Sequence, residues 1–340
     1  MPLFKRSALF AAVLALFATL LTGCSSSDEQ ASEVTELTIY SGRSEEYNGS
    51  ILEDWEKQSG IKLNIRYGDS AELAAQILEE GSNSPADLFI SQDAGSLGAV
   101  SAAGLLLTLG DEVATEVPSQ FVAADRSWAG MTGRARVLAY SPERAKSLPQ
   151  SVAELTGPQY KNRVGIAPTN ASFQTFVTAL IEKKGEAFAK NWLAGMKAND
   201  AKIYAKNSLI VEAIDKGEID YGLVNHYYLW EVSESLGRPV KAKNHFFAAG
   251  DLGNLINVSG VGVLASSKKQ AAAITFINYL TSAMVQAKFV DQSHEYSLIP
   301  GAPAPEGVPS LEQIGAPSVD LNSLANLKRT QALLIEVGLL

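Results

Sequence analysis

Short apolar segments alternate with amphipathic segments along most of this chain, and this alternation constrains its fold more than any other feature. Residues 37–40 and 61–67 have the composition and alternation of strands. Between them, Ile51 and Trp55 recur at helical spacing in a segment that stops at Gly60. This order is typical of proteins in which helices connect parallel strands. The sequence therefore predicts an α/β fold.

The same alternation continues toward the C-terminus. We expect Ser70 to cap a helix that ends at Gly81. Further short strands are expected at 87–90, 137–140, 164–167 and 222–224. In parallel sheets, ligands bind at the carboxyl ends of the strands. The polar residues that follow expected strands are therefore candidates for a site, and they are Ser44, Gln92, Asp93, Asn170 and the pair Tyr227-Tyr228.

The N-terminus has the features of a bacterial export signal. Lys5 and Arg6 precede an apolar run over residues 8–21, which is too short to span a membrane comfortably. The Leu-Thr-Gly-Cys sequence that follows resembles a lipoprotein cleavage site. We therefore expect a signal peptide over residues 1–23 and a lipid on Cys24. The alternative is an ordinary secreted protein with a chance cysteine.

Cys24 is the only cysteine of the chain, so an internal disulfide is excluded. Residues 24–35 are rich in serine and acidic residues, which predicts a flexible tether. The mature protein is therefore expected to be exported and lipid-anchored at the cell membrane, facing the periplasm or the cell exterior.

Composition limits the class of protein. With 340 residues, 46% hydrophobic residues and a formal net charge of −9, the chain is globular and large enough for two domains. The acidic balance and the lack of basic clusters argue against nucleic acid as a partner. No G-x-S-x-G or H-E-x-x-H sequence occurs, and the 3 histidines have no obvious acidic partner. We therefore expect a monomeric binding protein and not an enzyme.

Two adjacent phenols, Tyr227 and Tyr228, end the last of these strands. A free phenol titrates at about pH 10, so it becomes an anionic ligand at neutral pH only when a strongly electrophilic cation displaces its proton. Ferric iron is such a cation. The alternative is that the pair closes a strand or packs in a core. Strand alternation directs the preceding His226 away from the face that Tyr227 uses.

Several segments occur together in an order that resembles one protein family. They are 37–43, 85–89, 103–106, 133–137, 204–208 and 225–228. On these residues the chain is similar to the ferric-ion-binding substrate-binding proteins of bacterial iron ABC importers, some of which are lipoproteins. The resemblance implies capture of ferric iron outside the cytoplasm and delivery to an ABC permease in the membrane. The alternative is a binding protein of the same fold for another small anion or a chelated metal complex.

The resemblance also implies a two-lobed periplasmic-binding-protein-like fold of type II, with mostly parallel sheets joined by hinge strands. The chain would cross between lobes near residues 134–140 and return near 255–264. The N-terminal lobe would then contain residues 36–134 and 257–340, and the C-terminal lobe residues 135–256.

In that family, two adjacent tyrosines ligate Fe³⁺, and Tyr227 and Tyr228 match them. Phosphate or carbonate acts as a synergistic anion in many members, and its cradle matches Asn170, Ala171, Ser172, Asn207 and Asn225. A helix is expected directly after Asn170, and helix N-termini bind anions. Without the resemblance, Asn170 would be interpreted only as a helix N-cap.

The chain departs from the best-known members at two positions. Those members have a histidine near the first strand and a glutamate after the Pro-Ala-Asp segment, where this chain has Ser44 and Gln92. A hydroxyl and a neutral amide are poor ligands for Fe³⁺. The site would then depend on the phenols and the anion, and the acids that could substitute are Glu45, Glu46 and Asp93.

Four further residues are expected to contact the cleft. Arg134 and Arg136 could hold a carbonate through their planar guanidinium groups, or they could form hinge salt bridges. Arg43 follows the first strand and would come from the opposite lobe. Tyr140 is a possible additional ligand, with hinge packing as the alternative.

Overall fold

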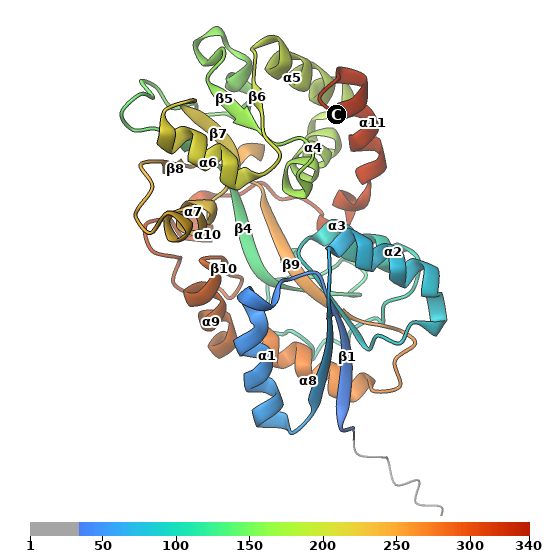
Figure 1. Cartoon of the computed structure of the whole chain (residues 1–340). Helices are drawn as coiled ribbons and strands as arrows, with labels where there is room; N and C mark the ends of the chain where they lie inside the picture. Colours follow the sequence, from blue (N-terminus) through green and yellow to red (C-terminus); the bar gives the residue numbers. More distant parts are fainter. Residues whose placement is uncertain (1–33) are drawn as a thin grey trace, which may run out of the picture. The chain divides into compact units, whose positions relative to one another are not determined.

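The computed structural model describes residues 34–340, and Figure 1 shows the course of the chain. The expected signal peptide over 1–23, the lipid site Cys24 and nearly all of the tether over 24–35 lie outside the described residues. Residues 35–340 cluster into one unit. In this part of the chain, no helix is both long and apolar enough to cross a membrane.

The first strands and helices follow the predicted order. The strands are β1 (Glu36–Ser41), β2 (Lys62–Tyr67) and β3 (Leu88–Ser91). The helices after them are α1 (Glu45–Ser59), α2 (Ser70–Glu80) and α3 (Ala94–Ala102). Strand β1 pairs in parallel with both β2 and β3. As predicted, α1 ends at Gly60, which adopts a left-handed conformation with φ of 71°.

The predicted cap of α2 is wrong. Asp69 caps this helix, because its carboxylate accepts a 2.8 Å hydrogen bond from the backbone N–H of Ala71. Ser70 is the first residue of the helix, and its Oγ accepts a 2.9 Å hydrogen bond from the backbone N–H of Gln92. Ser70 therefore fastens the start of α2 to the loop after β3.

Two strands run through the middle of the sheet path, β4 (Ala129–Tyr140) and β9 (Ile256–Val263). The strand order is β2-β1-β3-β9-β4-β7-β5-β6, and β9 is antiparallel to both β3 and β4. Both strands lie where the crossings between lobes were expected. Parallel pairing is thus confined to the strands on either side of β4 and β9.

Strand β4 changes partner along its length. From Ala129 to Ala135 it pairs with β9, and from Arg136 to Tyr140 it pairs with β7 (Tyr221–Asn225). The strand therefore passes from one sheet into the other between Ala135 and Arg136. This step places Arg136 directly opposite Asn225.

The second sheet is built around β7. Its other strands are β5 (Val164–Ile166), β6 (Lys202–Ile203) and β8 (Lys243–His245). Its helices are α4 (Ala171–Lys184), α5 (Glu186–Ala198), α6 (Asn207–Lys216) and α7 (Tyr228–Leu236). Strand β5 pairs in parallel with β6 and β7, and β4 is antiparallel to β7 and β8. Three of these helices, α4, α6 and α7, begin just after the carboxyl ends of β5, β6 and β7.

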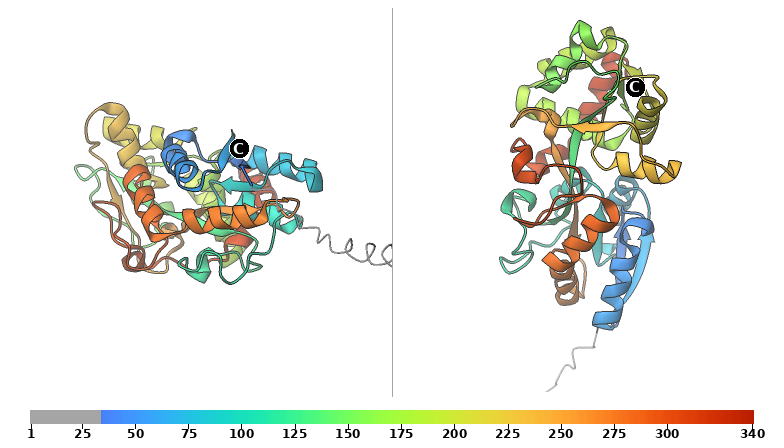
Figure 2. Two further views of the ribbon diagram at one scale, coloured as in Figure 1. Left: turned by 90° about the horizontal axis from the view of Figure 1, so that it is seen from below. Right: turned by 90° about the vertical axis from the view of Figure 1, so that its left-hand side faces the viewer.

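The chain after β9 returns to the first sheet. Its elements are α8 (Gln270–Leu280), α9 (Ala283–Ser293), β10 (Tyr296–Ser297) and α10 (Leu311–Ile314). Helix α8 packs against β9 and α9 packs against α1, an arrangement visible in Figure 2. The short 3-10 helices are η1 (Gly81–Asn83), η2 (Ser119–Phe121), η3 (Val152–Thr156), η4 (Pro158–Tyr160), η5 (Leu252–Asn254) and η6 (Leu321–Ala325).

The last helix, α11 (Leu327–Val337), packs against α4 and α5 and so differs from the prediction for residues 257–340. Thr330 Oγ1 lies 2.7 Å from Thr178 Oγ1 of α4, and Arg329 Nε donates a 2.7 Å hydrogen bond to Glu186 of α5. Leu333 and Leu334 are buried on the same helix. The apolar face of α11 is therefore covered by helices of residues 135–256, the range expected to form the C-terminal lobe.

Candidate metal and anion site

The two phenols lie in the turn between β7 and α7. Tyr227 occupies the N-cap position of α7 and Tyr228 is its first residue. Their rings stack, with centroids 4.5 Å apart and an interplanar angle of 27°. Tyr227 is only 8% exposed. As predicted, the pair follows the carboxyl end of a strand.

The environment of Tyr227 opposes its ionisation. Burial raises the pKa of Tyr227 well above its usual value, the neighbouring Tyr228 raises it further, and Arg134 lowers it. The hydroxyl is therefore protonated at neutral pH. A cation that binds there must displace the proton, which a highly charged metal ion can do.

Arg136 lies beside the phenols, on β4 opposite Asn225. Its Nη1 donates a 3.0 Å hydrogen bond to Ser172 Oγ, and its Nη2 donates one of 3.0 Å to the carbonyl of Leu223. Burial lowers the pKa of Arg136 to about 9, against the opposing effect of Tyr228 and Tyr227. The guanidinium is still protonated at neutral pH, so it is a buried cation that an anion would stabilise.

Ser172 links two other residues of the predicted cradle, Asn170 and Asn207, to Arg136 in one hydrogen-bonded network. Its hydroxyl donates to Asn170 Oδ1 at 2.6 Å and accepts from Arg136 and, at 3.2 Å, from Asn207 Nδ2. Asn170 also caps α4, since its Oδ1 accepts a 3.0 Å bond from the backbone N–H of Ser172. The N-cap interpretation of Asn170 is therefore confirmed. Ala171, the first residue of α4, is exposed.

The cradle has the polarity of an anion site. Three helices, α4, α6 and α7, begin around it, and each helix N-terminus carries a partial positive charge. Asn207 is the first residue of α6, and its buried Oδ1 has no hydrogen-bond partner among the described residues. Asn225 is also buried, at the end of β7. Three of the residues predicted from the resemblance, Asn170, Ser172 and Asn207, thus lie together beside Arg136, and Asn225 is paired with Arg136 across the strands.

The opposite side of the site contains a buried ion pair. Arg43 Nη1 lies 2.8 Å from Glu295 Oε2 and donates a 3.2 Å hydrogen bond to Thr132 Oγ1. Thr132 Oγ1 also donates to Glu295. Arg43 and Arg134 both lower the pKa of the Glu295 carboxyl, although its burial opposes them. Glu295 was not a candidate in the sequence, because it belongs to no recognisable pattern there.

Arg134 is placed between these two groups. Its charge affects both Tyr227 and Glu295, and it is 4% exposed. Within the described chain, its Nε and Nη2 make no hydrogen bond. Neither Arg134 nor Arg136 forms a direct ion pair with a described residue, so the hinge salt bridges that we considered are not formed.

Several expected cleft contacts have other roles. Asp93 caps α3, where its carboxylate accepts hydrogen bonds from the backbone and the hydroxyl of Ser96 at 2.8 and 3.1 Å. Ser44 is exposed at the N-cap position of α1, and its side chain makes no capping bond there. Gln92 is half-buried and Glu45 is exposed. These residues therefore supply no preformed metal ligand in this structure.

Tyr140 is not part of the site. It pairs with Tyr221 at the start of β7, whereas the phenol pair follows the end of that strand. Its ring packs edge-on against His245 at a centroid distance of 6.4 Å. The hinge-packing alternative therefore describes Tyr140 better than the ligand role.

His226 is also unavailable to a metal ion. Its Nδ1 accepts a 3.2 Å hydrogen bond from the backbone N–H of Ala135, so Nε2 carries the proton and donates to the carbonyl of His294 at 2.8 Å. Burial lowers the pKa of His226 to about 4. In the part of the chain that the structure covers, no three His, Cys, Asp or Glu side chains group closely enough to hold a metal.

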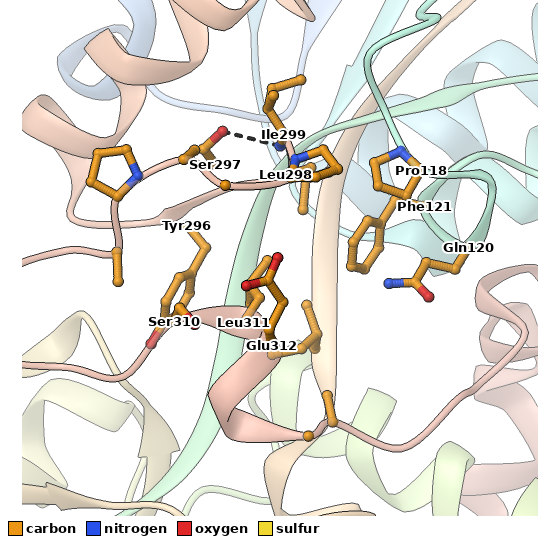
Figure 3. A pocket seen from close by; sticks show the side chains of 18 residues that line it. Pro118, Gln120, Phe121, Tyr296, Ser297, Leu298, Ile299, Ser310, Leu311 and Glu312 are labelled. Carbon is orange, nitrogen blue, oxygen red and sulfur yellow. Dashed lines mark hydrogen bonds between the residues drawn. The ribbon is translucent and has the colours of Figure 1, made fainter.

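A cavity of about 550 Å³ opens beside Tyr227. Its remaining lining comes from α1, α7 and the end of α9, with the residues Ser50, Glu231, Glu234, Ser235, Gln292, Ser293 and His294. A second cavity, of about 340 Å³, lies between β9, β10 and the proline-rich loop, and the Glu312 carboxylate points into it (Figure 3). Of the candidate site residues, only Tyr227 lines the first cavity and none lines the second. The first cavity therefore gives access to Tyr227, while the cradle around Ser172 lies outside the lining of both.

The chain is similar to one family of bacterial proteins and to several iron-binding proteins. A family model described as bacterial extracellular solute-binding protein matches residues 83–320. The major ferric iron-binding protein of Neisseria meningitidis serogroup A is 34% identical over 311 residues, which cover 90% of this chain and 94% of that protein. Iron-bound HitA from Pseudomonas aeruginosa is 33% identical with a TM-score of 0.82, covering 89% of this chain and 99% of that one. A Trichodesmium protein (IdiA, FutA) in complex with iron and citrate ligands is 26% identical with a TM-score of 0.80, over 89% and 99% of the two chains.

Proposed function

This chain belongs to the bacterial extracellular solute-binding proteins, and from that premise we propose that it captures ferric iron together with a small anion and delivers it to an ABC-type permease. Its two-lobed α/β fold is shared with HitA. The family is a class of solute-binding transport proteins and not an enzyme class. The function is therefore capture and release of a ligand in the cleft beside Tyr227.

The observation that carries this proposal is that one buried cation, Arg136, adjoins both the phenol pair and the cradle. Tyr227 and Tyr228 stack at the start of α7, and both raise the pKa of the buried Arg136. Arg136 in turn donates to Ser172 of the cradle. Phenol oxygens for a metal and donors for an anion thus adjoin one another, as a metal–anion pair requires.

Charge balance favours a trivalent metal with a divalent anion. Two phenolates leave one positive charge on Fe³⁺, and the buried guanidinium of Arg136 adds another. Carbonate or hydrogen phosphate would neutralise these two charges, and its oxygens would add ligands that two phenolates cannot supply. The buried Arg134, whose charge also acts on Tyr227, further favours an anion. The iron and citrate ligands of the Trichodesmium protein support some variation in the anion. Asn170, Ser172, Asn207 and Asn225 would hold the anion in our proposal, next to the backbone of Ala171.

A second candidate, another small anion or a chelated metal complex in the same cleft, rests on the opposite wall. Ser44 and Gln92 offer no strong ligand for a bare Fe³⁺, while Arg134 has buried donors without a partner among the described residues. A ligand that brings its own oxygen atoms would suit this combination.

The lobes themselves are part of the proposal. Residues 36–134 would form one lobe with the chain from 257 to about 325, and residues 135–256 would form the other with α11. We further propose a lipid anchor at Cys24 and a monomeric state. The anchor would keep the loaded protein at the membrane that holds the permease.

A visible spectrum with and without ferric ion tests the proposal. Tyrosinate-to-ferric charge transfer should give a red-orange colour in the parent protein. The double variant Tyr227→Phe/Tyr228→Phe keeps the stacked rings and removes only the oxygens, so it should stay folded and lose the band. Tyr140→Phe, at the end of β4 opposite the start of β7, is the matched control and should keep the band. A double variant that binds Fe³⁺ as tightly as the parent would show that the site is elsewhere.

A further inference from the structure

His226, the residue before the phenol pair, is bound to the crossing strand β4 in two ways. Its backbone N–H donates a 3.0 Å hydrogen bond to the carbonyl of Ala135, and its Nδ1 accepts one of 3.2 Å from the N–H of the same residue. Ala135 is the last residue of β4 that pairs with β9. His226 therefore fixes the start of the phenol turn to the point where the chain passes between the two sheets.

The other ring nitrogen of His226 binds a different part of the chain. Nε2 donates a 2.8 Å hydrogen bond to the carbonyl of His294, which ends α9. His294 has a φ of 53°, a left-handed conformation that is uncommon outside glycine. Its ring stacks on Trp230 of α7, with centroids 5.2 Å apart and planes at 18°. The next residue, Glu295, forms the ion pair with Arg43. The turn at His294 and Glu295 thus contacts elements of both lobes.

The imidazole of His226 has little freedom to move. Both nitrogens are used, and only the neutral form with a proton on Nε2 satisfies both hydrogen bonds. The ring is fully buried, and the ring of Tyr296 lies 4.6 Å away between centroids. Tyr296 also lines the cavity of Figure 3 and donates a 2.9 Å hydrogen bond to the carbonyl of Pro309. A side chain held in this way can hold its neighbour in a defined orientation.

We propose that His226 is a positioning residue for the iron site, because it ties the Tyr227 turn both to β4 and to the turn that holds Arg43. The proposal rests on the proposed function, in which Tyr227 is a ligand. Movement of one lobe relative to the other would act on His226 through the carbonyl of His294. The orientation of Tyr227, and with it the release of iron, is therefore linked to the relative position of the lobes.

The test compares variants that remove one bond at a time. His226→Asn keeps an acceptor close to the position of Nδ1, His226→Gln keeps a donor close to that of Nε2, and His226→Ala keeps neither. The control is His245→Gln, since Nε2 of His245 also donates a hydrogen bond to a backbone carbonyl, that of Pro149 at 2.7 Å, and the residue lies outside the site. Each protein is loaded with Fe³⁺ in phosphate buffer, and release to a chelator is followed by the charge-transfer band.

We expect His226→Ala to release iron about tenfold faster than the parent, as loss of an outer-shell contact does at metal sites, and to shift the band. The release rates of His226→Asn and His226→Gln should lie between those of the parent and of His226→Ala. The release rate of His245→Gln should match that of the parent. Variants of His226 that fold but keep the parent rate and band would overturn the proposal. If none of them folds, Trp230→Leu carries the test, because this half-buried side chain supports the His294 ring. Trp230→Leu should also release iron faster than the parent. A release rate equal to that of the parent would refute the proposed link between the His294 turn and the iron site. A parent protein without any band would instead refute the proposed function.

Discussion

Arg136 Nη1 donates a 3.0 Å hydrogen bond to Ser172 Oγ, and this contact joins the crossing strand to the N-terminus of α4. Both phenols raise the pKa of the same guanidinium, which burial lowers. Its position follows from the step of β4 between sheets, because that step makes Arg136 the first residue paired with β7. The proposed metal ligands and the proposed anion donors thus adjoin one buried cation.

Removing the charge of Arg136 should weaken iron binding. A hydrogen bond to a charged group contributes about 1.5–3 kcal/mol, so Arg136→Gln should lose roughly 10- to 100-fold in affinity for Fe³⁺ in phosphate buffer. The matched control is Arg238→Gln, which removes a guanidinium that pairs with Asp215 and is half exposed. Competition against a chelator measures the Fe³⁺ affinity of each variant. Equal affinities for the two variants would contradict the role of Arg136.

Binding should depend on an added anion. Two phenolates cannot fill an octahedral ferric shell, and Asp93, Ser44 and Gln92 supply no preformed ligand. Removal of phosphate and carbonate should therefore weaken Fe³⁺ binding markedly, and either anion should restore it. A titration followed at the charge-transfer band measures the effect. Unchanged affinity in anion-free buffer would mean that protein side chains complete the shell.

The iron-free protein should lose stability as the pH falls below about 6.5. Burial lowers the pKa of His226 to about 4, while an unfolded histidine titrates at about 6.5. Between these two values the unfolded state binds a proton that the folded state does not. The free energy of unfolding therefore becomes smaller as the pH falls. Well above pH 6.5 His226 causes no loss of unfolding free energy, and at pH 4 the loss reaches about 3 kcal/mol.

Urea denaturation of the parent and of His226→Gln across this range measures the effect. Glutamine does not titrate, so the difference between the two curves isolates His226 from the other groups. The parent should lose more stability than the variant on acidification. Parallel curves would show that His226 does not titrate with so low a pKa.

The sequence predicted the elements that local pattern determines. The strands and helices around β1, β2 and β3 follow from apolar periodicity, and the phenol pair follows from its place after β7. The anion cradle required the resemblance, because a polar residue before a helix is by itself only a cap. Asn170 is a helix cap, and it also belongs to the cradle that we propose.

Contacts between distant segments could not be predicted in this way. Glu295 lies 252 positions from its partner Arg43, and no local pattern indicates that pairing. The amphipathic pattern of α11 indicates a buried face but does not specify which helices cover it. Tyr140 has the same strand phase as Arg136 and therefore the same face. At about 3.3 Å per residue it is roughly 13 Å further along β4, which is too far for a common ligand.

Loading with iron should bring the lobes closer together. The phenols and the cradle follow strands of the second sheet, while Arg43, Ser44 and Gln92 follow strands of the first. A metal–anion pair bound to one wall attracts polar groups of the other, and rotation about β4 and β9 would allow them to meet. The ligand must bind the closed form more tightly, since equal affinity for both forms changes nothing.

Small-angle scattering should therefore give a smaller radius of gyration for the iron-loaded protein. The control is Tyr227→Phe/Tyr228→Phe, whose radius should not respond to ferric ion. An identical radius for the loaded and empty parent would mean that iron is captured on one lobe without closure.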